Sequence, residues 1–175
     1  MRRLFIAALA AATGLVGGAG SLRADSVEVT GVHLCCPRCV TVAAGAVGKV
    51  EGVTDAKADR ATKKVTFTAK DEKATKAAQA AFTEAGFYGT FKVDGKELAG
   101  EAAPTKKDEK LTEVTVTKAH ICCGACKTAA KALFKDSEVS FPDGMKDVIK
   151  VTGKDLSSAD ILETLHKAGF GGKVD

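Results

Sequence analysis

The six cysteines of this chain lie in two short segments that share one pattern, His-x-Cys-Cys-x-x-Cys. The first segment is His33–Cys39, and the second is His120–Cys126, which starts 87 residues later (120 − 33). In each segment the last two cysteines form a C-x-x-C pair, whose spacing lets two sulfurs converge on one ion. Such pairs are typical of sites for soft metals. The paired cysteines are Cys36, Cys39, Cys123 and Cys126.

Each segment also offers two further ligands. A third cysteine, Cys35 or Cys122, precedes the pair, and a histidine, His33 or His120, stands two residues before it. Side chains two apart in an extended chain share a face, so these groups can turn toward the pair. Two thiolates can hold Cu(I) or Hg(II), whereas Zn(II) or Cd(II) favours four ligands in a tetrahedron. We therefore predict one thiophilic ion per segment, with the C-x-x-C cysteines as primary ligands, the third cysteine as a third or exchange ligand, and the histidine as a candidate fourth ligand.

Other uses of the cysteines compete with metal binding. Exported cysteines commonly form disulfides, but three per segment is an odd number, and a bond between Cys35 and Cys36 would close a strained ring. A C-x-x-C pair can also do redox chemistry, so a thiol–disulfide oxidoreductase is the alternative function and a disulfide-stapled adaptor a third. A single site built from both pairs would need closure over more than eighty residues, which favours separate sites.

The flanks of the two segments repeat as well, so the chain contains two copies of one unit. Hydrophobic periodicity predicts strand, helix, strand, strand, helix and strand in each copy. This order indicates an α+β fold of two tandem ferredoxin-like βαββαβ sandwiches, each with two helices on one face of a four-stranded antiparallel sheet. The expected strands are residues 27–30, 53–56, 65–69 and 91–93 in the first copy and 114–117, 139–141, 149–153 and 173–174 in the second.

The metal-binding segments fall between the first strand and the first helix of each copy. Pro37 suits the first turn of a helix, which makes Cys36 the N-cap and places Cys39 in the first turn. Free N–H groups and the positive end of the helix dipole favour thiolate over thiol at this position.

The sequence outside the cysteine segments predicts an exported protein in two parts. Residues 1–24 have the basic start, the apolar core and the small residue at the end that are typical of a cleavable signal peptide. We expect metal-binding domains at residues 25–94 and 112–175, a flexible linker at residues 95–111, and a periplasmic or secreted location. After cleavage no segment suited to membrane insertion remains.

The composition excludes several classes of function. The net charge of +4 includes three arginines of the leader, so the mature chain carries about +1, which is too little for nucleic-acid binding. The chain shows no Ser-His-Asp order, paired-carboxylate motif or Gly-rich phosphate loop. We therefore expect a binding protein rather than an enzyme. His166 has a threonine as its counterpart in the first copy and is expected on the exposed face of a helix.

The two cysteine segments resemble the M-x-C-x-x-C loop of heavy-metal-associated domains. This family includes copper chaperones, the tails of metal-pumping ATPases and the periplasmic mercury-binding protein. The loop is matched by Leu34–Cys39 and Ile121–Cys126, and later landmarks of the family are matched by Glu51–Val53 and Ala85–Phe87. The resemblance spans nearly all of residues 26–94 and, more loosely, residues 112–175.

This resemblance implies a fold and a function. It implies a βαββαβ fold and a monomeric chaperone or scavenger for a thiophilic metal, with a membrane metal transporter or another metal-binding domain as its partner. The sequence departs from the family in two respects. Leu34 and Ile121 replace the family methionine and are expected to point into the core, and each loop carries the additional cysteine and histidine.

Overall fold

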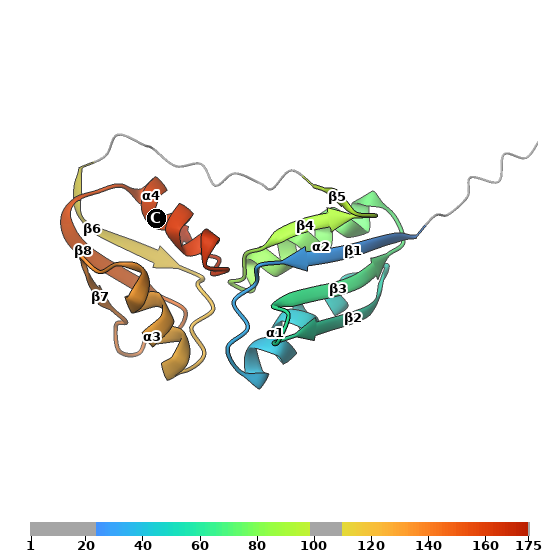
Figure 1. Ribbon diagram of the computed structural model, residues 1–175, viewed down its shortest axis with the longest axis horizontal. Coiled ribbons are helices and arrows are strands. Elements are labelled where there is room, and N and C mark those ends of the chain that lie inside the picture. The colour runs from blue at the N-terminus through green and yellow to red at the C-terminus, as the bar shows by residue number, and fades with distance from the viewer. Residues whose placement is uncertain (1–23, 99–109, 175) are drawn as a thin grey trace, which may run out of the picture.

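The computed structural model describes residues 24–98 and 110–174. All but the last residue of the predicted leader and most of the predicted linker lie outside these ranges. Within them the chain forms two α+β units that lie side by side, as Figure 1 shows. None of the described helices has the length and apolar character needed to cross a membrane.

The two units share one order of elements. The first unit consists of β1 (Asp25–Thr30), α1 (Pro37–Gly48), β2 (Val53–Asp59), β3 (Lys64–Ala69), α2 (Glu72–Glu84), β4 (Thr90–Val93) and β5 (Lys96–Glu97). The second consists of β6 (Leu111–Thr117), α3 (Gly124–Leu133), β7 (Glu138–Ser140), β8 (Ile149–Leu156), α4 (Ser158–Lys167) and β9 (Lys173–Val174). Apart from β5, both units therefore follow the predicted order.

The described strands form one antiparallel sheet per unit. The strand order is β2-β3-β1-β4-β5 in the first sheet and β7-β8-β6-β9 in the second. In both sheets the first strand of the unit lies between the third and the fourth, for example with Val29 opposite Val65 on one side and Phe91 on the other. The loop that follows this central strand therefore starts in the middle of the unit, beside the other unit.

Alternating strand residues and one face of each helix form the core. Val27 and Val29 of β1, Phe82 of α2 and Leu165 of α4 are almost entirely buried. The two amphipathic helices of each unit cover one face of its sheet (Figure 1). This packing fixes the position at which α1 and α3 begin, and these starts carry the cysteines.

The observed boundaries differ little from the predicted ones. The clearest addition is β5, which pairs with β4 through Lys96 opposite Val93. It falls at the start of the predicted linker and extends the first sheet by one short strand. Asp94 and Gly95 have positive φ angles of 48° and 81°, which form the tight turn that this hairpin requires.

Candidate metal centre

The start of each first helix positions a C-x-x-C pair. Cys36 is the N-cap of α1 with an extended backbone, and Pro37 occupies the first turn, as the sequence predicts. Cys123 is the N-cap of α3 in the same way. In this geometry the N-cap sulfur and the sulfur three residues later face each other, at 3.5 Å between Cys36 and Cys39 and 3.8 Å between Cys123 and Cys126.

The turn between the second and third strands supports each cysteine loop. The carbonyl of Lys63 accepts a hydrogen bond from the N–H of Val32 at 3.1 Å, and the carbonyl of Asp147 accepts one from the N–H of Ala119 at 2.9 Å. The Asp147 carboxylate also accepts from the N–H of Ile121 at 3.2 Å. Lys63 and Asp147 both have a positive φ, 54° and 60°. Sequence reasoning missed these two residues. The signal for them is that Asp147 follows Lys63 by 84 residues, the same spacing that separates the third predicted strand of one copy from that of the other.

The two C-x-x-C pairs lie against each other. The sulfur of Cys122 lies 3.5 Å from that of Cys36 and 3.4 Å from that of Cys39. The relation is reciprocal, because the sulfur of Cys35 lies 3.8 Å from that of Cys123 and 3.3 Å from that of Cys126. Each pair therefore has a sulfur of the other unit in contact with it, in addition to the third sulfur of its own unit.

These distances suit a shared metal centre. All six cysteines lie within the described ranges and are free thiols. Two sulfurs bound to one tetrahedral ion, each at about 2.3 Å from it, would lie about 3.8 Å apart. The contacts here span 3.3 to 4.0 Å, far above the bonding distance of about 2.0 Å in a disulfide. The six thiols therefore lie close together without forming disulfide bonds.

The centre of the cluster is buried and its rim is accessible. Cys39 and Cys126 are fully buried, whereas Cys35, Cys36, Cys122 and Cys123 are half-buried. Burial, together with hydrogen bonds to neighbouring thiols, raises the pKa of Cys35 and of Cys122. The N–H group of Cys126 in the first turn of α3 lowers the pKa of Cys123. A sulfur with a lowered pKa therefore lies on the accessible rim of the cluster.

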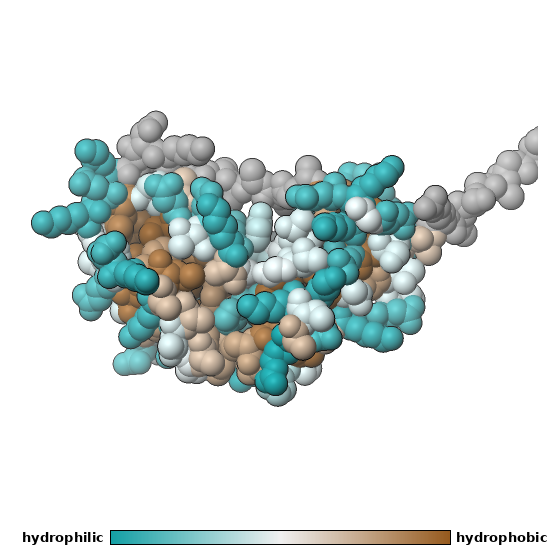
Figure 2. All heavy atoms as spheres, in the orientation of Figure 1, coloured by the Kyte–Doolittle hydropathy of each residue, from teal (hydrophilic) through white to brown (hydrophobic). Residues whose placement is uncertain are grey.

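A seam of backbone hydrogen bonds holds the two loops together. The carbonyl of Gly169 accepts from the N–H of His33 and of Tyr88, both at 3.2 Å. Reciprocally, the carbonyl of Gly86 accepts from the N–H of His120 at 3.1 Å and of Gly171 at 2.9 Å. Phe87 and Phe170 form an antiparallel bridge between the units. In Figure 2, tan and white spheres predominate at the lower middle of the molecule, where the units meet.

The two glycines of the seam leave no room for a side chain. A Cβ on Gly86 would lie 2.4 Å from the backbone nitrogen of His120, and one on Gly169 would lie 2.4 Å from that of His33. Both glycines also have a positive φ, 83° and 81°. The Ala-Gly-Phe sequence that follows each second helix, Ala85–Phe87 after α2 and Ala168–Phe170 after α4, therefore forms part of the contact between the units as well as ending the helix.

The two histidines pack across the same seam. The ring of His33 stacks on Phe170 with centroids 4.0 Å apart, and the ring of His120 stacks on Phe87 at 4.4 Å. In the described part of the chain, Nε2 of each ring is buried without a hydrogen-bond partner. Burial lowers the pKa of His120, and burial with the nearby charge of Lys63 lowers the pKa of His33 to about 4. Both rings are thus held in the neutral form that can bind a metal.

The cysteines predicted to form two separate sites lie together in the structure, so the number of ions remains a prediction. All six sulfurs form a single cluster between the units, in which every C-x-x-C pair touches sulfurs of the other copy. The prediction considered the length of chain between the pairs, but loop-closure entropy grows only slowly with length. The docking of two folded units closes the loop without any need for the intervening chain to be short.

The predicted ligands are only partly equivalent in the structure. A nitrogen of His33 lies within 4.8 Å of the sulfurs of Cys35 and Cys126, so these three can surround one ion. Among the described residues, His120 belongs to no such group. Leu34 is buried as predicted, whereas Ile121 is only half-buried.

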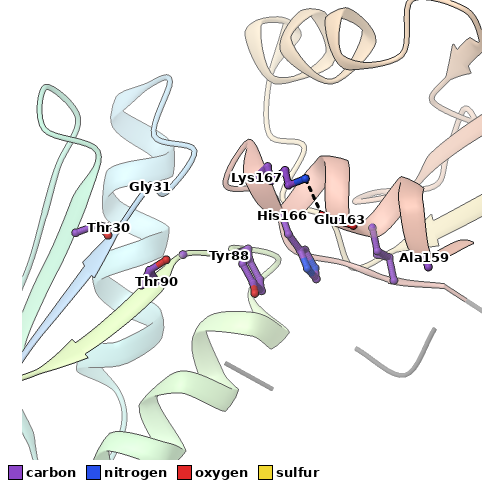
Figure 3. A pocket seen from close by; sticks show the side chains of 10 residues that line it. Thr30, Gly31, Tyr88, Thr90, Ala159, Glu163, His166 and Lys167 are labelled. Atoms are coloured by element: carbon purple, nitrogen blue, oxygen red, sulfur yellow. Dashed lines mark ion pairs between the residues drawn. The ribbon is translucent and has the colours of Figure 1, made fainter. Parts of the chain in front are cut away.

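The prediction for His166 is wrong. It is half-buried and stacks on Tyr88 with ring centroids 3.8 Å apart and almost parallel planes. Burial lowers its pKa. Figure 3 shows the two rings in a groove of about 370 Å³ between the units. The sequence assigned His166 to an exposed helix face because the packing of one unit on the other is not encoded in helical periodicity.

Comparison with known proteins yields a distant likeness. No family model and no curated protein matches the chain. The water-soluble region of the P-type ATPase CopA from Bacillus subtilis is 20% identical with a TM-score of 0.33, over 87% of this chain and 92% of that one. A solution structure of the N-terminal soluble domains of the same ATPase is 22% identical with a TM-score of 0.29, over 87% and 93%.

Proposed function

We propose that this protein binds and transfers a thiophilic metal ion at the cysteine cluster between its two units. The observation that carries the proposal is the convergence of six unbonded sulfurs from two distant segments, at distances that suit a common metal. Thiolates select Cu(I), Zn(II) and related soft ions over Mg²⁺ or Ca²⁺. The strand order of both units supports two ferredoxin-like domains of the heavy-metal-associated type.

The graded burial of the sulfurs supports transfer rather than permanent storage. Cys36 and Cys123 lie on the accessible rim, whereas Cys39 and Cys126 lie at the buried centre. An incoming thiolate of a partner can replace a rim ligand first while the buried sulfurs still hold the ion. Such stepwise exchange lets the ion pass on without unfolding of either domain. The partner in this proposal is a membrane metal transporter or another metal-binding domain.

The leader-like sequence of residues 1–24 supports a role outside the cytoplasm. In the periplasm or outside the cell, free thiols are exposed to oxidation. Bound metal would protect them, because a coordinated thiolate is a weaker nucleophile toward oxidants. Scavenging and delivery of Cu(I), Zn(II) or Hg(II) are both consistent with this location.

Metal analysis of anaerobically purified protein tests the proposal. The reduced wild-type chain is expected to retain Cu(I), Zn(II) or Hg(II) after gel filtration, as measured by elemental mass spectrometry. A variant with all six cysteines changed to serine is the control and should retain none. Wild-type protein that holds no metal while its thiols are free, yet catalyses exchange between dithiols and disulfides, would instead identify an oxidoreductase.

A further inference from the structure

The six sulfurs are arranged as a strip of connected triangles. Among the described sulfur atoms, the contacts of 4.0 Å or less close four triangles. In order along the strip they are Cys36-Cys39-Cys122, Cys39-Cys122-Cys126, Cys35-Cys39-Cys126 and Cys35-Cys123-Cys126. Each triangle shares an edge with the next, and each contains sulfurs of both units.

Every triangle has the dimensions of a three-coordinate site. A soft ion about 2.3 Å from each of three sulfurs would hold them about 4 Å apart. The edges of the outer triangle of Cys36, Cys39 and Cys122 measure 3.4 to 3.5 Å. Those of the inner triangle of Cys35, Cys39 and Cys126 measure 3.3 to 4.0 Å. Outward shifts of a few tenths of an ångström would seat an ion in either one.

Two of the sulfurs are shared more than the rest. Cys39 and Cys126 each belong to three of the four triangles, and their sulfurs lie 4.0 Å apart at the middle of the strip. They are also the two fully buried cysteines. By contrast, Cys36 and Cys123 each belong to one triangle at an end of the strip. Cys39 and Cys126 therefore have the positions expected of bridging ligands, and Cys36 and Cys123 have those of terminal ligands.

Charge balance is compatible with more than two monovalent ions. Two Cu(I) ions held by the four C-x-x-C thiolates leave a net charge of −2, with Cys35 and Cys122 as neutral thiols. Four Cu(I) ions held by all six thiolates leave the same net charge of −2. Uncompensated buried charge is unfavourable, and filling further triangles as more thiols ionise does not add to it.

We infer that the six cysteines hold one polynuclear Cu(I) cluster of more than two ions, in which Cys39 and Cys126 bridge neighbouring ions. The inference rests on the proposed metal-binding function and adds the nuclearity, the bridging ligands and the requirement for both units. Each Cu(I) binds with release of thiol protons, and no electron is transferred.

Titration of the reduced full chain with Cu(I) tests the nuclearity. Cu(I) is supplied anaerobically in a competing chelator, the bound ions are counted by native mass spectrometry, and X-ray absorption is recorded on the loaded protein. The expected result is a final species with more than two ions and a copper–copper scattering shell. Saturation at one or two ions without that shell would overturn the cluster but leave the proposed function intact. Failure to bind Cu(I), Zn(II) or Hg(II) at all would remove the proposed function itself.

A matched pair of substitutions within one C-x-x-C motif tests the bridging role. Cys39→Ser removes a sulfur from three triangles, whereas Cys36→Ser removes one from a single triangle. Cys39→Ser is therefore expected to lose more Cu(I) ions than Cys36→Ser, and Cys126→Ser more than Cys123→Ser. Equal losses of one ion per substitution, as for two separate sites, would refute the inference. Circular dichroism of each metal-free variant confirms that the comparison is made between folded proteins.

The third cysteines provide an independent check. The double variant Cys35→Ser/Cys122→Ser keeps both C-x-x-C pairs and replaces only half-buried side chains with ones of similar size. It is expected to bind at most two Cu(I) ions and to lose the copper–copper shell. Retention of the wild-type number of ions would show that the C-x-x-C pairs alone set the capacity and would overturn the cluster.

Discussion

His33 and His120 occupy equivalent positions in the repeat, but their surroundings differ. Both rings stack on a phenylalanine of the other unit. Among the described residues, His33 belongs to a group that could surround one ion, with Cys35 and Cys126, and His120 belongs to none. The stack contributes about 0.5–1.5 kcal/mol if it resembles other aromatic pairs. Packing therefore explains both histidines, and for His33 we propose ligation as a second role.

Substitution by phenylalanine separates these two roles. His33→Phe and His120→Phe keep a ring on a ring and remove a buried nitrogen without a hydrogen-bond partner, so both variants should unfold at or slightly above the wild-type temperature. Zn(II), which favours four ligands, should bind His33→Phe about tenfold or more weakly and His120→Phe as it binds the wild type. Competition with a chromophoric chelator measures both affinities. Equal zinc affinities of the two variants would exclude His33 as a ligand.

The sequence predicts which residue types are candidate ligands better than it predicts how these residues are grouped in space. Cysteine type, C-x-x-C spacing and Pro37 define a helix start with two facing sulfurs, which are all local properties. The contact of Cys122 with Cys36 and Cys39 arises only when two folded units dock. No local spacing encodes such docking, so the expectation of one site per copy followed from sequence distance alone.

At the scale of elements, the turn after α2 and the turn after α4 determine how the units meet. Gly86→Ala would place a Cβ 2.4 Å from the nitrogen of His120 and is expected to open the seam. The variant should show a larger radius of gyration in X-ray scattering and a lower Cu(I) capacity, although no ligand is altered. Gly95→Ala is the matched control, because Gly95 also has φ near +81° but has no atom within 4 Å of the added Cβ. A compact Gly86→Ala protein with full capacity would contradict this role of the seam.

An ion-pair group at the end of α2 gives the seam a pH dependence. Glu84 of the first unit pairs with Lys118 and Lys173 of the second. Hydrogen bonds from these two lysines lower the pKa of Glu84 from an ordinary value of 4.5 to about 2. The folded protein thus binds the proton less readily than the unfolded chain. The contribution of the Glu84 ion pairs to the stability of the folded protein is complete above about pH 4.5 and is lost as the pH falls toward 2.

Glu84→Gln should remove this dependence. Compared with the wild type, the variant is expected to have a lower urea midpoint at pH 7 and a smaller change in midpoint between pH 4.5 and 2. Glu72→Gln is the control, because Glu72 pairs with Lys76 of the same helix. If both variants respond equally to pH, the pairs of Glu84 do not contribute to the seam.

The elements themselves follow closely from the sequence, with exceptions that have physical causes. Ser157 caps α4 by accepting a hydrogen bond from the N–H of Asp160, and either Ser157 or Ser158 suits this role from the sequence. The short strand β5 has no hydrophobic alternation, because both of its residues are exposed, and it is held by main-chain pairing alone. His166 shows the opposite case, in which a residue on a polar helix face is covered by the neighbouring unit.

For the whole molecule, the contact between two units supplies what one small unit lacks. A unit of about 65 residues buries a modest fraction of its surface, and its cysteine loop offers three sulfurs on an open edge. The second copy covers that edge and brings three further sulfurs to the same place. Metal binding and docking of the units therefore depend on the same contacts, and each should strengthen the other.

This coupling predicts how the protein unfolds. Without metal, the reduced chain is expected to unfold in two calorimetric transitions, because the described contacts between the units are few beside those within each unit. Bound Cu(I) links sulfurs of both units and should merge the transitions into one at higher temperature. A ligand at 1,000 times its Kd adds about 4 kcal/mol of stability. The Cys35→Ser/Cys122→Ser variant, which leaves each C-x-x-C pair to bind alone, should keep two transitions even when loaded. Two transitions in the loaded wild type would mean that the ions do not join the units, and the shared centre would then have no part in holding the molecule together.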